Sequence, residues 1–128
     1  MKLLLDTHIF LWFISGDLRL PILFRNEIQD PNNAVFLSVA SLWEIIIKYK
    51  IGKLPLPQSP EIYIPRERQR HQIKSLAINE SSFKHLVSLP NLHRDPFDRL
   101  LISQTLSEGL TIVTVDHEIL NYNITYLK

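Results

Sequence analysis

The chain has 128 residues, the size of one ordinary domain, and a chain of this length buries roughly two-thirds of its unfolded surface when it folds. Apolar residues make up 45% of the sequence and charged residues 21%, which excludes a disordered tail, a collagen-like repeat and a coiled coil. The formal net charge is +1, so the overall charge provides no argument for a polyanionic partner.

The chain contains no cysteine. Disulfide scaffolds, thiolate zinc sites and cysteine nucleophiles are therefore excluded, and a reducing cytoplasm suits such a protein. No apolar run approaches the roughly 18 residues that a membrane-spanning helix needs. We expect a cytoplasmic protein with no membrane span.

Short apolar runs alternate with longer segments of helical period, which is typical of an α/β protein. In the first half of the chain we expect, in order, a strand, two helices, a turn, a strand and a further helix, at residues 2–5, 7–15, 21–29, 31–33, 34–37 and 38–51. Gly52 then stands where a helix C-terminal cap is expected. Residues 54–65 contain four of the eight prolines, so we expect a loop or irregular connector there.

In the second half of the chain, the basic stretch at residues 66–71 is expected to end a helix. After it we expect a strand, a short helix, a longer helix ended by Gly109, a strand, a short helix and a closing strand, at residues 73–78, 79–88, 95–107, 110–115, 116–120 and 123–127. The predicted strands number about five, and residues 1–128 are expected to form a single domain.

Four carboxylates are expected to meet at one edge of the sheet, because parallel strands joined by right-handed crossovers all end at the same edge. Asp6 directly follows the first strand, and Asp116 comes one residue after the fourth. Glu44 lies about two turns into the helix after the second strand, among apolar neighbours. Asp98 lies in the first turn of the helix that precedes the fourth strand.

Clustered carboxylates repel one another, and one of them normally takes up a proton unless a cation neutralises the group. Hard oxygen ligands without His or Cys favour Mg²⁺ or Mn²⁺ over zinc. Such a cation makes water a stronger acid and offsets the charge that builds on a phosphodiester during attack. The sequence therefore predicts metal-dependent phosphodiester hydrolysis, with Asp6 and Asp98 holding the metal most directly and with Glu44 and Asp116 completing the cage.

Each acid also has a purely structural interpretation. Asp6 and Asp116 could each cap the helix that follows, and Glu44 could pair with Lys48 one turn on, which contributes only about 0.2–0.5 kcal/mol on a helix surface. Asp95 is favoured as an N-cap because Pro96 would occupy the first helical position, so whether Asp95 also assists at the site stays open. None of these individual roles explains why the four acids share one edge of the sheet.

Other chemistries find little support. The five histidines, which include His93, show no metal-ligand spacing, so surface or core roles are expected for them. With only three glycines there is no phosphate-binding glycine-rich loop. The basic residues around Lys48 and residues 66–74 could form a rim that holds a phosphate backbone, or simply a solvated helix face.

Four segments in order read LLLDTH, SVASLWEI, HRDPFDRLLI and TIVTVD, at residues 3–8, 38–45, 93–102 and 111–116. Together they resemble the PIN-domain family, and within it the VapC-type toxins of bacterial type II toxin–antitoxin pairs. The resemblance spans nearly the whole chain. It implies a three-layer α/β/α fold around a central, mostly parallel sheet, and an endoribonuclease that uses Mg²⁺ or Mn²⁺.

Carried over position by position, the resemblance implies that Asp6, Glu44, Asp98 and Asp116 are the acids that bind the metal and cleave RNA. The candidates for contact with RNA are residues in or beside these segments: Thr7, Lys48, Arg94 and Thr114. The resemblance also implies a homodimer and a small cognate antitoxin. One departure is that Ile102 and Ser103 stand where many members have two alanines, which concerns helix packing more than chemistry.

Two alternatives remain open. A catalytically silent PIN-like module that binds RNA or a protein would look similar, although retention of all four acids argues against it. A receiver-type phosphoacceptor domain also has an acidic pocket on a parallel sheet, but here the third predicted strand ends at Asn79, with no aspartate to phosphorylate.

Overall fold

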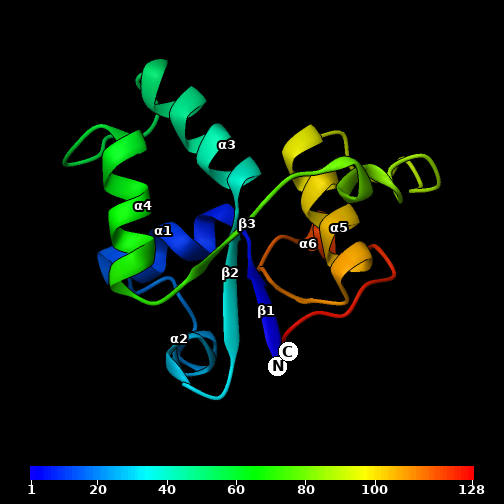
Figure 1. The fold of residues 1–128 in the computed structure, drawn as a ribbon, viewed down its shortest axis with the longest axis horizontal. Coiled ribbons are helices and arrows are strands. Elements are labelled where there is room, and N and C mark those ends of the chain that lie inside the picture. Colours follow the sequence, from blue (N-terminus) through cyan, green and yellow to red (C-terminus); the bar gives the residue numbers. More distant parts are fainter.

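The structure, a computed structural model, describes residues 1–128, and its centre is a four-stranded parallel sheet (Figure 1). The strands lie in the order β3-β2-β1-β4, with bounds β1 Lys2–Leu5, β2 Ala34–Ser38, β3 Lys74–Leu76 and β4 Thr111–Val113. Leu4 in β1 pairs with Phe36 on one side and with Ile112 on the other. The predicted parallel sheet is therefore confirmed.

The predicted closing strand at residues 123–127 is reduced to an isolated bridge between Ile112 and Tyr126. The backbone of Ile112 exchanges hydrogen bonds with Thr125 and Leu127. Since β4 is only three residues long, it offers the returning chain little length for pairing. The sheet thus has four strands instead of about five.

Helices cover both faces of the sheet, which confirms the three-layer α/β/α arrangement (Figure 1). Their bounds are α1 Thr7–Ser15, α2 Ile22–Gln29, α3 Val39–Lys50, α4 Pro60–Arg70, α5 Pro96–Glu108 and α6 His117–Leu120, with a short 3₁₀ helix η1 at Glu80–Phe83. Helices α1, α2 and α4 lie on one side of the sheet, and α5 and α6 lie on the other. The longest of them, α5, has 13 residues, and no helix is long and apolar enough to cross a membrane.

The sheet separates two apolar cores because alternate side chains of a strand point to opposite faces. Leu3 and Leu5 belong to the larger core, with α1, α2 and α4. Leu4 belongs to the smaller core, where it joins residues of α5, β4 and α6. A strand buried on both faces reads as a continuous apolar run, and burial of each leucine contributes about 1.5–3 kcal/mol.

Two further predicted elements differ from the structure. Helix α4 begins at Pro60, inside the stretch predicted to be a loop, because a proline in the first helical turn loses no hydrogen bond. Pro65 lies inside α4, but its neighbour Ile64 is buried in the larger core, and that burial offsets the missing hydrogen bond. The helix predicted at residues 79–88 is only η1 followed by turns, started by reciprocal capping between Asn79 and Ser82.

Candidate metal centre

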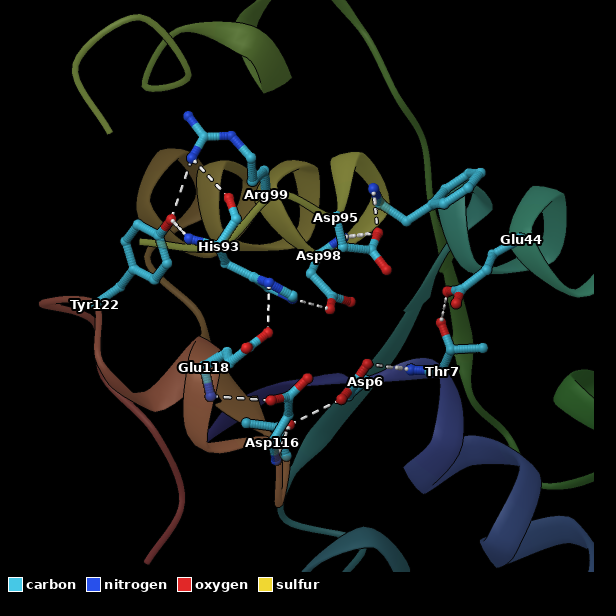
Figure 2. Close-up of polar contacts among 12 residues, drawn as sticks. Asp6, Thr7, Glu44, His93, Asp95, Asp98, Arg99, Asp116, Glu118 and Tyr122 are labelled. Atoms are coloured by element: carbon cyan, nitrogen blue, oxygen red, sulfur yellow. Dashed lines mark hydrogen bonds and ion pairs between the residues drawn. The ribbon is translucent and has the colours of Figure 1, made fainter. Parts of the chain in front are cut away.

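The carboxyl edge of the sheet carries the candidate acids, and its backbone brings two of them together. The amide of Asp6 donates to the carbonyl of Val113 at the end of β4, with a distance of 3.0 Å. Asp116 follows Val113 by three positions, so both acids lie where β1 and β4 end (Figure 2). Asp98 comes from the first turn of α5 and Glu44 from α3. We call these four residues the acidic centre.

Asp6 serves as a helix cap and as a member of the acidic centre. Its Oδ1 accepts a hydrogen bond of 2.8 Å from the amide of Thr7, and its Oδ2 accepts one of 2.8 Å from the hydroxyl of Thr114. Burial raises the pKa of Asp6 above its ordinary value, although the hydrogen bond from Thr114 acts in the opposite direction. The two interpretations of Asp6 are therefore compatible.

Glu44 is buried, and each of its oxygens already has a donor. Oε1 accepts from the hydroxyl of Thr7 at 2.8 Å, and Oε2 accepts from Nζ of Lys48 at 2.8 Å. Burial opposes the charge on Lys48, but the hydrogen bond and negative charge of Glu44 outweigh burial and raise the pKa of the lysine. The pairing of Glu44 with Lys48 exists, and it is a half-buried interaction rather than a solvated one.

Asp98 carries the clearest electrostatic signature in the molecule. Burial, together with the negative charge of Asp6, raises the pKa of Asp98 to about 7. Asp95 lies beside it and caps α5, because its Oδ1 accepts from the amides of Phe97 and Asp98. The helix-capping role that the sequence favours for Asp95 is thus confirmed.

Asp116 caps α6 through a hydrogen bond of 2.9 Å from the amide of Glu118 to Oδ1. Its own amide donates to the hydroxyl of Thr114 at 3.0 Å. Since the same hydroxyl donates to Asp6, one threonine positions two members of the acidic centre.

His93 is a site residue that the sequence reasoning missed. Its Nε2 lies 2.7 Å from Oδ2 of Asp98, and its Nδ1 lies 2.7 Å from Oε2 of Glu118 (Figure 2). One ligand atom from each of His93, Asp98 and Asp116 lies within 4.8 Å of the other two. The sequence predicts a surface or core role for His93 and does not place it at the site, because its partners come from different elements and show no fixed spacing in sequence. Its place five residues before Asp98, in the third segment of the family resemblance, was the available signal.

The four residues predicted to contact RNA have different surroundings. Thr7 and Thr114 are each 2% exposed and donate to carboxylates of the acidic centre, which supports a positioning role. Lys48 is partly exposed beside Glu44, and Arg94 is exposed next to His93. Contact of these residues with RNA stays a prediction, and the burial of the two threonines does not favour it for them.

The donor set fits a divalent cation. Carboxylate oxygens and an imidazole nitrogen converge at His93, Asp98 and Asp116, and the pKa of Asp98 is raised by burial and then by the negative charge of Asp6. A bound cation relieves this repulsion by favouring the ionised acids. Asp6, which follows the adjacent strand β1, would add a further oxygen ligand.

Comparison with solved structures supports the fold. The chain superimposes on a structure of VapBC2 from Rickettsia felis bound to a promoter DNA fragment, with a TM-score of 0.74, 18% identity, and coverage of 99% of this chain and 98% of that one. A structure of VapBC-1 from nontypeable Haemophilus influenzae gives a TM-score of 0.71 and 19% identity, with coverage of 100% and 98%. The TM-scores show a shared fold, and at these low sequence identities the comparison shows the fold alone.

Sequence comparison gives the family. A segment of 61 residues, 48% of this chain, is 38% identical to Ribonuclease VapC16 of Mycobacterium tuberculosis and spans 43% of that protein. The matched segment is thus less than half the length of that relative. A family model described as the PIN domain matches residues 3–124. The match spans β1, β4 and all four members of the acidic centre, and the chain belongs to the PIN-domain family.

Proposed function

We propose that this protein is an endoribonuclease that depends on Mg²⁺ or Mn²⁺ and uses the acidic centre to hydrolyse RNA phosphodiester bonds. The observation that carries the proposal is the convergence at one edge of acids that follow β1 and β4 and of acids in α3 and α5, with the pKa of Asp98 raised to about 7. The 38% identity to a ribonuclease over 61 residues supports the same chemistry.

Different residues of the acidic centre have different proposed roles in binding the cation and orienting water. Asp6 and Asp98 are the proposed principal cation ligands. Thr114 holds the carboxylate of Asp6, and Thr7 holds that of Glu44, so both acids are oriented before any substrate arrives. Once bound, a divalent cation supplies an acidified water and offsets charge on the phosphodiester. Asp116, whose carboxylate lies within 4.8 Å of that of Asp98, would hold the same cation. Glu44 then helps to orient the attacking water.

A pocket of about 270 Å³ next to Glu44 supports RNA as the substrate, because its lining holds the exposed Lys53 and also Lys48, which is paired with Glu44. It is lined by Thr7, His8, Leu11, Ile45, Lys48, Lys53 and Leu54. The lysines offer ammonium groups to phosphates, and the apolar side chains offer a surface for a base. Thr7 lines this pocket and also bonds Glu44, so a nucleotide bound here lies directly beside the acidic centre.

We further propose that the protein is the toxin of a VapC-type pair, neutralised by an antitoxin and forming a homodimer. The solved structures with the same fold include VapBC assemblies and a toxin–antitoxin complex from Klebsiella pneumoniae, with a TM-score of 0.62 and 16% identity. Exposed apolar side chains of α3 and α4, such as Trp43 at 59% and Ile62 at 58%, support protein partners. An RNA substrate and the absence of cysteine suit a cytoplasmic location.

The direct test is cleavage of RNA by the purified protein with Mg²⁺ or Mn²⁺, compared with the same reaction in excess chelator. Asp6→Asn and Asp98→Asn should abolish cleavage. Asp30→Asn is a matched control, because Asp30 lies in the turn before β2, away from the acidic centre, and its carboxylate accepts a hydrogen bond from the amide of Asn32 alone. Equal cleavage by all three variants would contradict the proposal.

A catalytically silent RNA-binding module is the competing function. It predicts RNA binding that is lost in chelator, with no cleavage product at any cation concentration. The appearance of cation-dependent product that Asp98→Asn lacks distinguishes the enzyme from this module.

A further inference from the structure

The imidazole of His93 lies between two carboxylates and points one nitrogen at the acidic centre (Figure 2). Nδ1 lies 2.7 Å from Glu118 Oε2, and Nε2 lies 2.7 Å from Asp98 Oδ2. Metal-binding histidines commonly donate their second ring N–H to a carboxylate, which fixes the tautomer and raises the basicity of the ligating nitrogen. With Glu118 holding Nδ1–H, the lone pair available for a cation belongs to Nε2.

The first turn of α6 holds this arrangement together. Asp116 caps the helix and accepts from the amide of Glu118 at 2.9 Å. Asp116, a potential oxygen ligand, and Glu118, whose carboxylate contacts Nδ1 of His93, therefore come from the same short turn. Their relative positions are set by the backbone, since α6 itself is packed through the fully buried Ile119.

The loop that carries His93 is clamped from both sides of its backbone. The amide of His93 donates to the hydroxyl of Tyr122 at 3.0 Å, and Nη1 of Arg99 donates to its carbonyl at 3.3 Å. The Tyr122 hydroxyl donates in turn to the carbonyl of Pro90 at 2.9 Å. Because Tyr122 is buried in the smaller core, the loop is anchored to the body of the protein and His93 is held in place.

We propose that His93 binds the catalytic divalent cation directly through Nε2, alongside Asp98 and Asp116. The three ligand atoms lie within 4.8 Å of one another, so one ion can reach all three after small side-chain rotations. His93 and Asp98 would both bind the cation once the proton shared by Nε2 and Oδ2 is released to solvent. This inference rests on the proposed function, since it concerns the same cation.

An imidazole ligand changes which cation the site prefers. Mg²⁺ favours an all-oxygen shell and dehydrates reluctantly, whereas imidazole nitrogen favours transition metals. A centre made only of Asp6, Glu44, Asp98 and Asp116 would accept Mg²⁺ and Mn²⁺ alike. With His93 as a ligand, Mn²⁺ is bound more tightly than Mg²⁺, and the difference depends on this one side chain.

The test is pulsed electron paramagnetic resonance of the RNA-free protein loaded with Mn²⁺. Directly bound histidine gives a nitrogen hyperfine coupling, which should shift when the protein is made with ¹⁵N-labelled histidine. His93→Gln should lose the coupling. His117→Gln is the matched control and should keep it, because His117 is exposed at the first position of α6 and makes no side-chain hydrogen bond.

Calorimetric titration provides a second readout. His93→Gln should weaken Mn²⁺ binding much more than Mg²⁺ binding. Glu118→Ala, which removes the group behind the imidazole, should weaken Mn²⁺ binding by about 10–100-fold. An equal loss for the two cations in His93→Gln would overturn the proposal, since it would make His93 a positioning residue for Asp98.

The absence of nitrogen coupling in Mn²⁺-loaded wild-type protein would also overturn it, and this measurement needs no variant to fold. The outcome is separable from the proposed function. Coupling without RNA cleavage would support His93 as a ligand while refuting the nuclease. Cation-dependent cleavage without coupling would refute His93 as a ligand and leave the nuclease intact.

Discussion

Thr114, just after β4, donates a hydrogen bond of 2.8 Å to Oδ2 of Asp6, just after β1, although the two residues are 108 positions apart in the chain. The same hydroxyl accepts a hydrogen bond of 3.0 Å from the amide of Asp116. A single buried side chain therefore aligns an acid from each of two neighbouring strand ends. The relative positions of Asp6 and Asp116 therefore depend on the pairing of β1 with β4.

Thr114→Val should destabilise the metal-free protein by about 1–3 kcal/mol, because Asp6 loses a buried donor and the amide of Asp116 loses its acceptor. Urea unfolding in chelator measures the change. Thr114→Ser keeps the hydroxyl and should recover most of the loss. A valine variant as stable as the wild type would show that the hydrogen bond contributes nothing.

Without a cation, the protein should lose stability as the pH rises from about 4 toward about 7. Folding raises the pKa of Asp98 from 3.8 to about 7, so over this range the folded carboxyl retains a proton that the unfolded one has released. The raised pKa of His93 acts in the same direction at the upper end of this range, since the stability it contributes is complete below its ordinary pKa of 6.5 and is lost as the pH rises through the raised pKa. Urea unfolding across this pH range, in chelator, measures the trend.

Asp98→Asn is the control for this pH dependence. The asparagine cannot titrate, so the variant should show a flatter pH dependence than the wild type and greater stability at neutral pH in chelator. Saturating Mn²⁺ should stabilise the wild type and leave Asp98→Asn almost unchanged. A wild-type stability that rises with pH in chelator would contradict the assigned electrostatics.

Lys53→Ala should weaken RNA binding and reduce the slope of log affinity against log salt by about 0.7, the value for one phosphate contact on a single strand. The reason is that Lys53 lines the pocket beside Glu44 and is exposed. Binding is measured in chelator, so that cleavage does not interfere. Lys2→Ala, at the opposite end of β1, should leave the slope unchanged.

Tyr122→Phe should loosen the loop that carries His93. The Tyr122 hydroxyl hydrogen-bonds with the amide of His93, the carbonyl of Pro90 and the guanidinium of Arg99. All three groups lose this partner in the variant. We expect a loss of about 1–3 kcal/mol in stability and faster hydrogen exchange of the His93 amide. Exchange at the wild-type rate would mean that the hydroxyl does not hold the loop.

Strand and helix order were predictable because local rules decide them. The run at Leu3, Leu4 and Leu5 is apolar since β1 is buried on both faces, and Asp95 with Pro96 is a helix start that its own neighbours satisfy. The expectation that the acids share the carboxyl edge needed only parallel strands and right-handed connections. The prediction of a loop at residues 54–65 failed at α4, where Ile64 packs in the larger core although Pro65 lies inside the helix, and local sequence does not express such packing.

The contacts within the site depend on distance in space, and these were not predictable. Nothing near His93 in sequence indicates Glu118 behind its ring, because α6 reaches it only after the chain has passed through α5 and β4. Thr7 and Thr114 are candidates for RNA contact by sequence, but in the fold both are buried and donate hydrogen bonds to Glu44 and Asp6. The sequence by itself thus determines which carboxylate and imidazole ligands are available. Only the tertiary structure decides their hydrogen-bond partners and protonation, because these depend on burial and on which strand ends lie side by side.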